Sequence, residues 1–225
     1  MTPPQTGMRI GQPGRPLDAR KDELILQAGR ELLLRGGPLA LTMEAVARAS
    51  GVSKATLYRR WPHREALLEA LVLREAQPLL SMLEGTPTDD AGLAAKLEAF
   101  LDSMLALMGQ PGYRAYLQAI VALPQQQADL QRIWWLGPHQ TMESVAALLR
   151  RYAAAQGRRW PAAARDAETL IGMAIGLEQA RILYRQRPWR ADARLRRRLI
   201  RAVVASFLGR RSAGIAVCEG NVGRG

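Results

Sequence analysis

The sequence of 225 residues predicts an all-α protein of about nine helices. Apolar residues recur with the 3.6-residue period of a helix, and Pro and Gly residues interrupt this period along the chain. No stretch shows the alternation of apolar and polar residues, enriched in β-branched and aromatic types, that is typical of strands. Hydrophobic residues make up 48% and charged residues 23% of the chain, as in ordinary globular proteins. The chain is therefore expected to fold into packed helices.

The N-terminal residues 1–16 are rich in Pro and Gly and predict a flexible arm. Asp18 can begin the first helix, which has one apolar face and ends at the Gly-Gly-Pro of residues 36–38. Thr42 is the predicted N-cap of a short second helix, because its hydroxyl can accept a hydrogen bond from a free backbone amide. Gly51 ends that helix, since glycine readily takes a left-handed backbone.

Ser53 is the predicted N-cap of a third helix, which ends before Pro62. A fourth helix is expected to begin at His63 or Arg64 and to continue to about Gln77, where Pro78 kinks or ends it. Longer helices are predicted at about 89–109, 112–123, 126–155, 162–185 and 191–208. These elements divide the chain into a flexible arm (1–16), an N-terminal domain with a connecting helix (17–77), a larger helical domain (78–208) and a flexible tail (209–225).

The formal net charge of +12 favours contact with a polyanion such as nucleic acid or an anionic membrane surface. All 32 basic residues except Lys21, Lys54 and Lys96 are arginines, and a GC-rich coding genome is an alternative source of part of this charge. The arginine-rich stretch 181–211 has Asp192 as its one acidic residue, so much of the excess lies far from the N-terminal helices.

The single cysteine, Cys218, allows no disulfide within one chain, which fits a reducing compartment. The N-terminus has no apolar run of the signal-peptide kind, and no stretch of about 18 apolar residues occurs. The expected location is the cytoplasm, without membrane contact.

The stretch "LTMEAVARASGVSKATLYRRW", from Leu41 to Trp61, has the pattern of a DNA-binding helix-turn-helix. At about 100° per residue, a third helix with Leu57 and Trp61 in the core directs Ala55 and Arg59 away from the protein. A face of this kind, with a small residue at its centre, suits a DNA major groove about 12 Å wide.

This geometry predicts a role for each residue of the helix. Ala55 can touch a thymine methyl group and Arg59 can make a bidentate contact with guanine, whereas the other polar side chains suit phosphate oxygens. For an arginine taken alone, a solvated surface charge is the alternative, and for Thr42 and Ser53 the alternative is capping only. The predicted DNA-binding residues are Thr42, Ser53, Lys54, Ala55, Thr56, Tyr58, Arg59, Arg60 and Arg64.

The segment from Thr42 to Leu71, above all "GVSKATLYRRW", resembles the DNA-binding domain of the TetR family of transcriptional regulators. It departs from the family pattern at Trp61, where Phe is commoner, and at the His-Arg-Glu of residues 63–65. The resemblance implies a homodimer with a four-helix interface formed by its last two helices, here about 162–185 and 191–208. It also implies a variable effector pocket. Independently, one helix-turn-helix covers a single half-site, so a dimer on a palindromic operator is expected.

Residues 89–160 hold the candidate effector pocket, because Met and aromatic side chains with a few polar groups are typical of such cavities. An apolar or aromatic small molecule would suit it, and filling of the core is the alternative for each of these side chains. The fourth helix is the expected lever between the two domains. The predicted effector-binding residues are Phe100, Met104, Met108, Tyr116, Trp134, Trp135, His139 and Met142.

The sequence disfavours an enzyme. Its two histidines, His63 and His139, have no metal-ligand spacing, and no glycine-rich phosphate loop follows a strand. No cofactor or metal is therefore expected. We predict a DNA-binding transcriptional regulator, most simply a repressor that an effector releases from its operator. The alternative is a general DNA-coating protein that binds through phosphate contacts alone.

Overall fold

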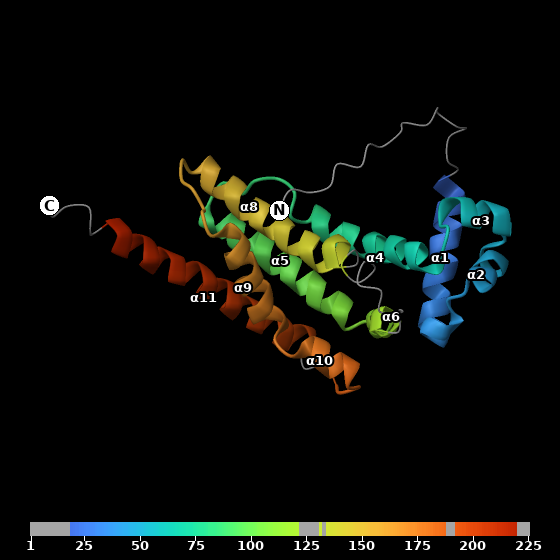
Figure 1. Cartoon of the computed structure of the whole chain (residues 1–225). Helices are drawn as coiled ribbons and strands as arrows, with labels where there is room; N and C mark the ends of the chain where they lie inside the picture. Colours follow the sequence, from blue (N-terminus) through green and yellow to red (C-terminus); the bar gives the residue numbers. More distant parts are fainter. Residues whose placement is uncertain (1–18, 122–130, 132–133, 188–191, 220–225) are drawn as a thin grey trace, which may run out of the picture.

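The computed structural model describes residues 19–121, 131, 134–187 and 192–219 (Figure 1). Within these residues the chain forms ten α-helices and no strand, which confirms the all-α prediction. None of these helices is long and apolar enough to cross a membrane. The α-helices are α1 (Ala19–Gly36), α2 (Met43–Ser50), α3 (Lys54–Arg60), α4 (Arg64–Ser81), α5 (Asp90–Met108), α6 (Pro111–Val121), α8 (Gln140–Ala155), α9 (Ala163–Ile175), α10 (Glu178–Leu183) and α11 (Ala193–Glu219).

A small core lies between α1, α2, α3 and the first half of α4, at the right of Figure 1. Ile25 of α1, Val46 of α2 and Leu57 of α3 are completely buried in it. Two successive residues of α4, Leu67 and Leu68, are also completely buried in it. The first three helices are thus held together by one apolar side chain or more from each element.

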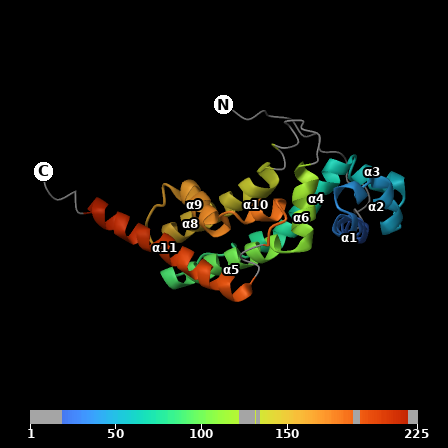
Figure 2. The ribbon, with the colours of Figure 1, turned by 90° about the horizontal axis from the view of Figure 1, so that it is seen from below.

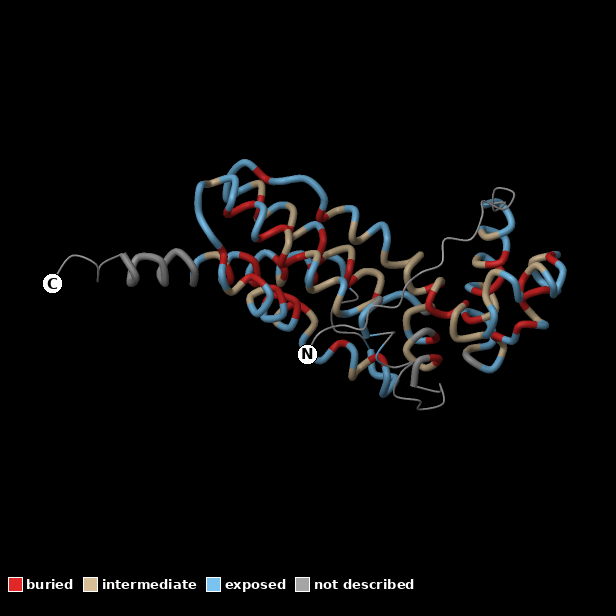
Figure 3. Tube along the Cα trace, turned by 45° about the horizontal axis from the view of Figure 1, so that its top comes forward, coloured by how far each residue is buried: buried red, intermediate tan, exposed pale blue. Residues whose placement is uncertain are grey.

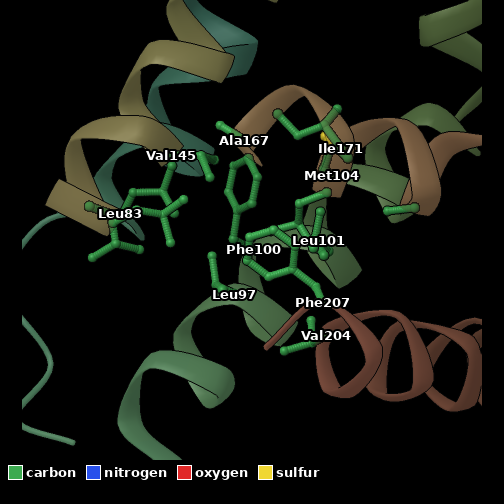
Figure 4. Packing of buried hydrophobic residues seen from close by; sticks show 14 of the residues in the cluster. Leu83, Leu97, Phe100, Leu101, Met104, Val145, Ala167, Ile171, Val204 and Phe207 are labelled. Atoms are coloured by element: carbon green, nitrogen blue, oxygen red, sulfur yellow. The ribbon is translucent and has the colours of Figure 1, made fainter. Parts of the chain in front are cut away.

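A larger core fills the space between α5, α8, α9 and α11. Figure 4 shows Phe100 of α5 near its centre, with Val145 of α8, Ala167 of α9 and Phe207 of α11 around it. Figure 2 shows α11 running along this bundle and beyond it, away from α1 to α3. The tube in Figure 3 shows buried segments along the inner sides of these helices and exposed segments outside.

Two helices belong to both cores. Helix α4 has Leu71 in the small cluster and Leu79 against the large one. Helix α6 buries Ala119 in the small cluster, whereas its Tyr113 and Leu117 pack against the large one. Both helices therefore connect the part of the chain that carries α3 to the larger bundle.

Several predicted helix bounds are wrong. Helix α4 continues through Pro78 to Ser81, because Leu79 and Leu83 beyond the proline pack on the large core. The single helix expected at 162–185 is interrupted at Gly176, whose φ of 54° and ψ of −125° suit glycine alone. Helix α11 continues to Glu219, past the end expected at about residue 208.

The helix expected at 126–155 contains a five-residue π-helical segment, η2 (Trp135–His139), immediately before α8. A short 3-10 helix, η1 (Pro38–Ala40), also follows α1. The predicted arm, residues 1–16, and most of residues 122–133 lie outside the described residues. The predicted domain bounds remain predictions.

Candidate nucleic-acid interface

The turn between α2 and α3 has the predicted local structure. Thr42 Oγ1 accepts a hydrogen bond of 3.1 Å from the backbone N–H of Ala45 and so caps α2. Gly51, with φ 68° and ψ 13°, ends α2 in the left-handed region. Ser53 Oγ accepts a hydrogen bond of 3.3 Å from the N–H of Thr56 and caps α3. The two predicted N-caps and the predicted turn are confirmed.

Helix α3 presents its predicted face to solvent. Leu57 is completely buried and Trp61 packs against the small core, so they anchor the helix. Lys54, Ala55 and Arg59 are exposed, and 41% of Tyr58 is accessible. The exposed face has a small residue beside two cations and a phenol, and nothing in the described part of the chain covers it. Thr56 of α3 and Arg64, the first residue of α4, are partly exposed.

One end of this face is electrostatically tied to α2. Lys54 Nζ lies 3.5 Å from Glu44 Oε1, and both side chains are more than half exposed. A hydrogen bond from the Glu44 backbone N–H, followed by the attraction of Lys54, lowers the pKa of the Glu44 carboxyl. Because exposed ion pairs are weak, Lys54 can exchange this carboxylate for a phosphate.

Arg60 is not placed as predicted. Its side chain is only 7% exposed and forms an ion pair with the carboxylate of Asp22 in the first turn of α1. A guanidinium buried against a carboxylate in its own chain would have to lose that partner to reach a phosphate. The phosphate contact predicted for Arg60 stays a prediction, and it would require this ion pair to break. Sequence reasoning missed Asp22, because its partner is distant in the sequence.

The structure separates the predicted effector-binding residues into several groups. Phe100, Met104 and Met108 are buried in the large core, and Met142 is partly buried against it. Trp134 and Trp135 are 50% and 57% exposed. The rings of Trp135 and His139 are 3.9 Å apart, centroid to centroid. The side chain of Tyr116 lies outside the described residues.

An open cleft of about 380 Å³ lies between the last turns of α4 and the outer side of α8. Four of its lining residues lie on one face of α8, and their spacing is visible in the sequence. The sequence does not show that this face lies opposite α4. None of the predicted effector-binding residues lines it. The lining residues are Gln77, Leu80, Leu83, Glu84, Gly85, Gln140, Ser144, Ala147 and Arg151.

Arg151 of α8 links the two sides of the cleft by hydrogen bonds. Its Nη2 donates a hydrogen bond of 2.8 Å to the Leu83 carbonyl and a longer one of 3.4 Å to the Gly85 carbonyl. These bonds hold the segment after α4 against α8. The cleft combines this cation and the carboxylate of Glu84 with amide, hydroxyl and apolar groups.

Comparison with known proteins agrees with this geometry. The family described as "Bacterial regulatory proteins, tetR family" matches residues 25–71, which span α1 to the first half of α4. An uncharacterized HTH-type transcriptional regulator of Mycobacterium tuberculosis is 43% identical over 67 residues, or 28% of this chain and 33% of the relative. The HTH-type transcriptional regulator AlkX of the same species is 33% identical over 86 residues, or 38% of this chain and 40% of that protein. The chain thus matches well under two thirds of these relatives' length.

Solved structures are similar over most of the chain. A TetR transcriptional regulator from Agrobacterium tumefaciens has a TM-score of 0.66 at 21% identity, covering 83% of this chain and 93% of that one. The flavonoid-responsive regulator FrrA has a TM-score of 0.63 at 27% identity, covering 85% of this chain and 96% of that one. The similarity in fold therefore extends from the helix-turn-helix through the larger bundle.

Proposed function

Because the chain belongs to the TetR family of bacterial transcriptional regulators, we propose that it represses transcription by binding a palindromic operator as a homodimer. A small effector then releases it. The exposed face of α3 carries this proposal, because Lys54, Ala55 and Arg59 are exposed to solvent on a helix that Ser53 caps.

In this function α3 lies in the major groove. Arg59 reads guanine through a bidentate contact, and Ala55 allows close approach to a thymine methyl group. Lys54 and Tyr58 at the edges of the face, together with Thr56 and Arg64, bind phosphates and set the register. Thr42 and Ser53 cap α2 and α3 and hold free backbone amides near the phosphates.

The proposed dimer uses α9 and α11, together with α10. The apolar residues that the sequence offered for this interface, such as Leu170 and Val204, are buried within the chain's own core. The exposed sides of α9 and α11 carry small residues instead, including Gly172, Ala202 and Ala205. Small residues let helices of two chains approach closely, and a dimer would place two copies of α3 about 34–36 Å apart on DNA.

The proposed effector site is the cleft between α4 and α8. Gln77 and Leu80 of α4 line it, and the other end of the same helix carries Leu67 and Leu68 in the small core. An effector that prefers one separation of α4 from α8 therefore also selects one position of the DNA-binding helices. The name of FrrA, and the mixture of apolar and polar groups in the cleft, favour an aromatic molecule with hydroxyl groups as the effector.

The decisive experiment selects duplexes from a random pool with the full-length protein and compares Arg59→Ala with the parent. We expect affinity to fall by about 1–3 kcal/mol and preference to be lost at one base position in each half-site. Arg159→Ala is the matched control, since it removes an exposed charge from the loop between α8 and α9. Equal parent affinity for selected and scrambled duplexes at physiological salt would favour a DNA-coating protein and refute the proposal.

A further inference from the structure

Arg60 is the last residue of α3 and the immediate neighbour of Arg59, but the two side chains have opposite environments. Arg59 is exposed, whereas the Arg60 side chain is 7% exposed and is paired with Asp22 of α1. The Asp22 side chain is itself 35% exposed. The proposed function assigns no role to this ion pair, although Arg60 belongs to the helix that is proposed to contact DNA bases.

The same turn of α1 also holds α4. Glu23, the residue after Asp22, forms an ion pair with Arg74 of α4. Two turns further along α1, Arg30 Nε donates a hydrogen bond of 2.9 Å to Glu75 Oε1. Helix α1 thus forms an ion pair with one side chain of α3 and with two side chains of α4.

Apart from the exposed Lys54–Glu44 ion pair, the other anchors of α3 are apolar. Leu57 and Trp61 hold the helix against the small core, but apolar contacts are not directional and allow the helix to rotate about its axis by small amounts. The Arg60–Asp22 ion pair adds an attachment between α3 and one point on α1. A buried guanidinium that loses its carboxylate is strongly unfavourable, so the helix must keep the rotation that preserves the pair.

We propose that Asp22 is a positioning residue for DNA recognition: through Arg60 it sets the rotation of α3, and with it the direction of Arg59. This inference rests on the proposed DNA-binding function. Asp22 itself does not touch DNA. Its loss changes the fit of the exposed face to the major groove and leaves every group on that face chemically intact.

The direction in which DNA affinity changes distinguishes a positioning role of Asp22 from simple electrostatic repulsion of DNA. Removing an acidic charge near DNA normally strengthens binding, because the protein repels the phosphates less. Glu44→Gln is the matched control, since Glu44 pairs with Lys54 at the exposed edge of the same interface. We expect Glu44→Gln to strengthen binding to all duplexes and Asp22→Asn to weaken binding to the selected duplex.

The experiment measures the affinity of the full-length protein for a duplex selected by the parent and for a scrambled duplex, over a series of salt concentrations. Asp22→Asn should lower affinity for the selected duplex by about tenfold, roughly the discrimination of one bidentate base contact. Affinity for the scrambled duplex should be unchanged or higher. Asp22→Glu, which keeps the carboxylate, should retain most of the selectivity.

The Arg60→Gln variant tests the alternative that Arg60 contacts a DNA phosphate directly. If Arg60 contacts a phosphate, this change lowers the slope of log affinity against log salt by about one. If Arg60 only positions α3, the slope stays the same and the Asp22→Asn/Arg60→Gln double variant loses no more selectivity than either single variant. Thermal unfolding identifies variants that do not fold. If Asp22→Asn does not fold, Asp22→Glu replaces it, and if Arg60→Gln does not fold, Arg60→Lys replaces it.

The inference would be overturned if Asp22→Asn bound the selected duplex as tightly as the parent or more tightly. It would also be overturned if Arg60→Gln lowered the slope of log affinity against log salt. A parent protein that selects no duplex at all would instead refute the proposed function. The two failures are therefore distinguishable.

Discussion

The small N-terminal core and the large core hold their helices by different means. Two helices of the DNA-binding region are short, with eight residues in α2 and seven in α3. Side-chain caps begin α2, α3 and α4, and α1 forms ion pairs with both α3 and α4. The larger region has longer helices, such as the 19-residue α5, packed through apolar side chains around Phe100.

This difference follows from helix length. In a helix of seven or eight residues, most backbone amides and carbonyls belong to one of the two ends, so caps satisfy a large share of them. In a helix of 19 residues the ends are a minor part, and burial of an apolar face supplies most of the stability. Polar changes should therefore affect the first region, and cavity-forming changes should affect the second most strongly.

The largest expected effect is that of Phe100→Ala in the large core. Removal of this completely buried ring should lower the free energy of unfolding by about 3–5 kcal/mol. Leu57→Ala in the small core should cost about 2–5 kcal/mol and abolish operator binding as well. Denaturant unfolding and DNA titration of both variants test this. A smaller loss for Phe100→Ala than for Leu57→Ala would contradict the comparison.

The two turn glycines provide a sharper contrast. Gly51 has a left-handed backbone that Asn tolerates, whereas Gly176, at φ 54° and ψ −125°, lies where side chains other than hydrogen are strained. Gly176→Asn should destabilise the protein by about 1–3 kcal/mol, and Gly51→Asn by less. Melting temperatures of the two variants, measured side by side, give the order. The reverse order would show that the break between α9 and α10 is not imposed by Gly176.

The third prediction compares caps in the two regions. Ser53 caps the seven-residue α3, and Asp89, whose Oδ1 accepts a hydrogen bond of 2.7 Å from the Gly92 N–H, caps α5. Ser53→Ala should lower the free energy of unfolding by about 0.5–2 kcal/mol and weaken DNA binding, because α3 begins there. Asp89→Ala should leave DNA binding unchanged. Equal losses of DNA affinity would contradict the regional assignment.

The smallest expected effect concerns a polar contact inside the larger region. The Tyr152 hydroxyl of α8 donates a hydrogen bond to Asp90 of α5, and burial, together with this bond, raises the pKa of Tyr152 to about 12. Tyr152→Phe should cost about 0.5–1.5 kcal/mol near neutral pH.

The same contact predicts a pH dependence. Because the pKa of Tyr152 is higher in the folded than in the unfolded chain, its stabilisation is complete below about pH 10, the ordinary tyrosine value, and is lost as the pH rises toward 12. Unfolding curves of the parent and of Tyr152→Phe should converge over this range. Curves that stay parallel would show that Tyr152 does not titrate with folding.

The sequence by itself was sufficient for the all-α fold class, the caps at Thr42 and Ser53, the left-handed turn at Gly51 and the outward direction of Arg59. Each depends on residues within about one helical turn of one another, where backbone geometry alone relates sequence to structure.

Only the tertiary structure decided the rest. The pairing of Arg60 with Asp22, the course of α4 through Pro78, the burial of Ala119 in the small core and the cleft between α4 and α8 each join residues from separate elements. Periodicity shows which face of a helix is buried, but not which partner meets it or how closely. For that reason Arg60 was predicted from its own helix to reach DNA, and a carboxylate 38 positions earlier gave it a different place.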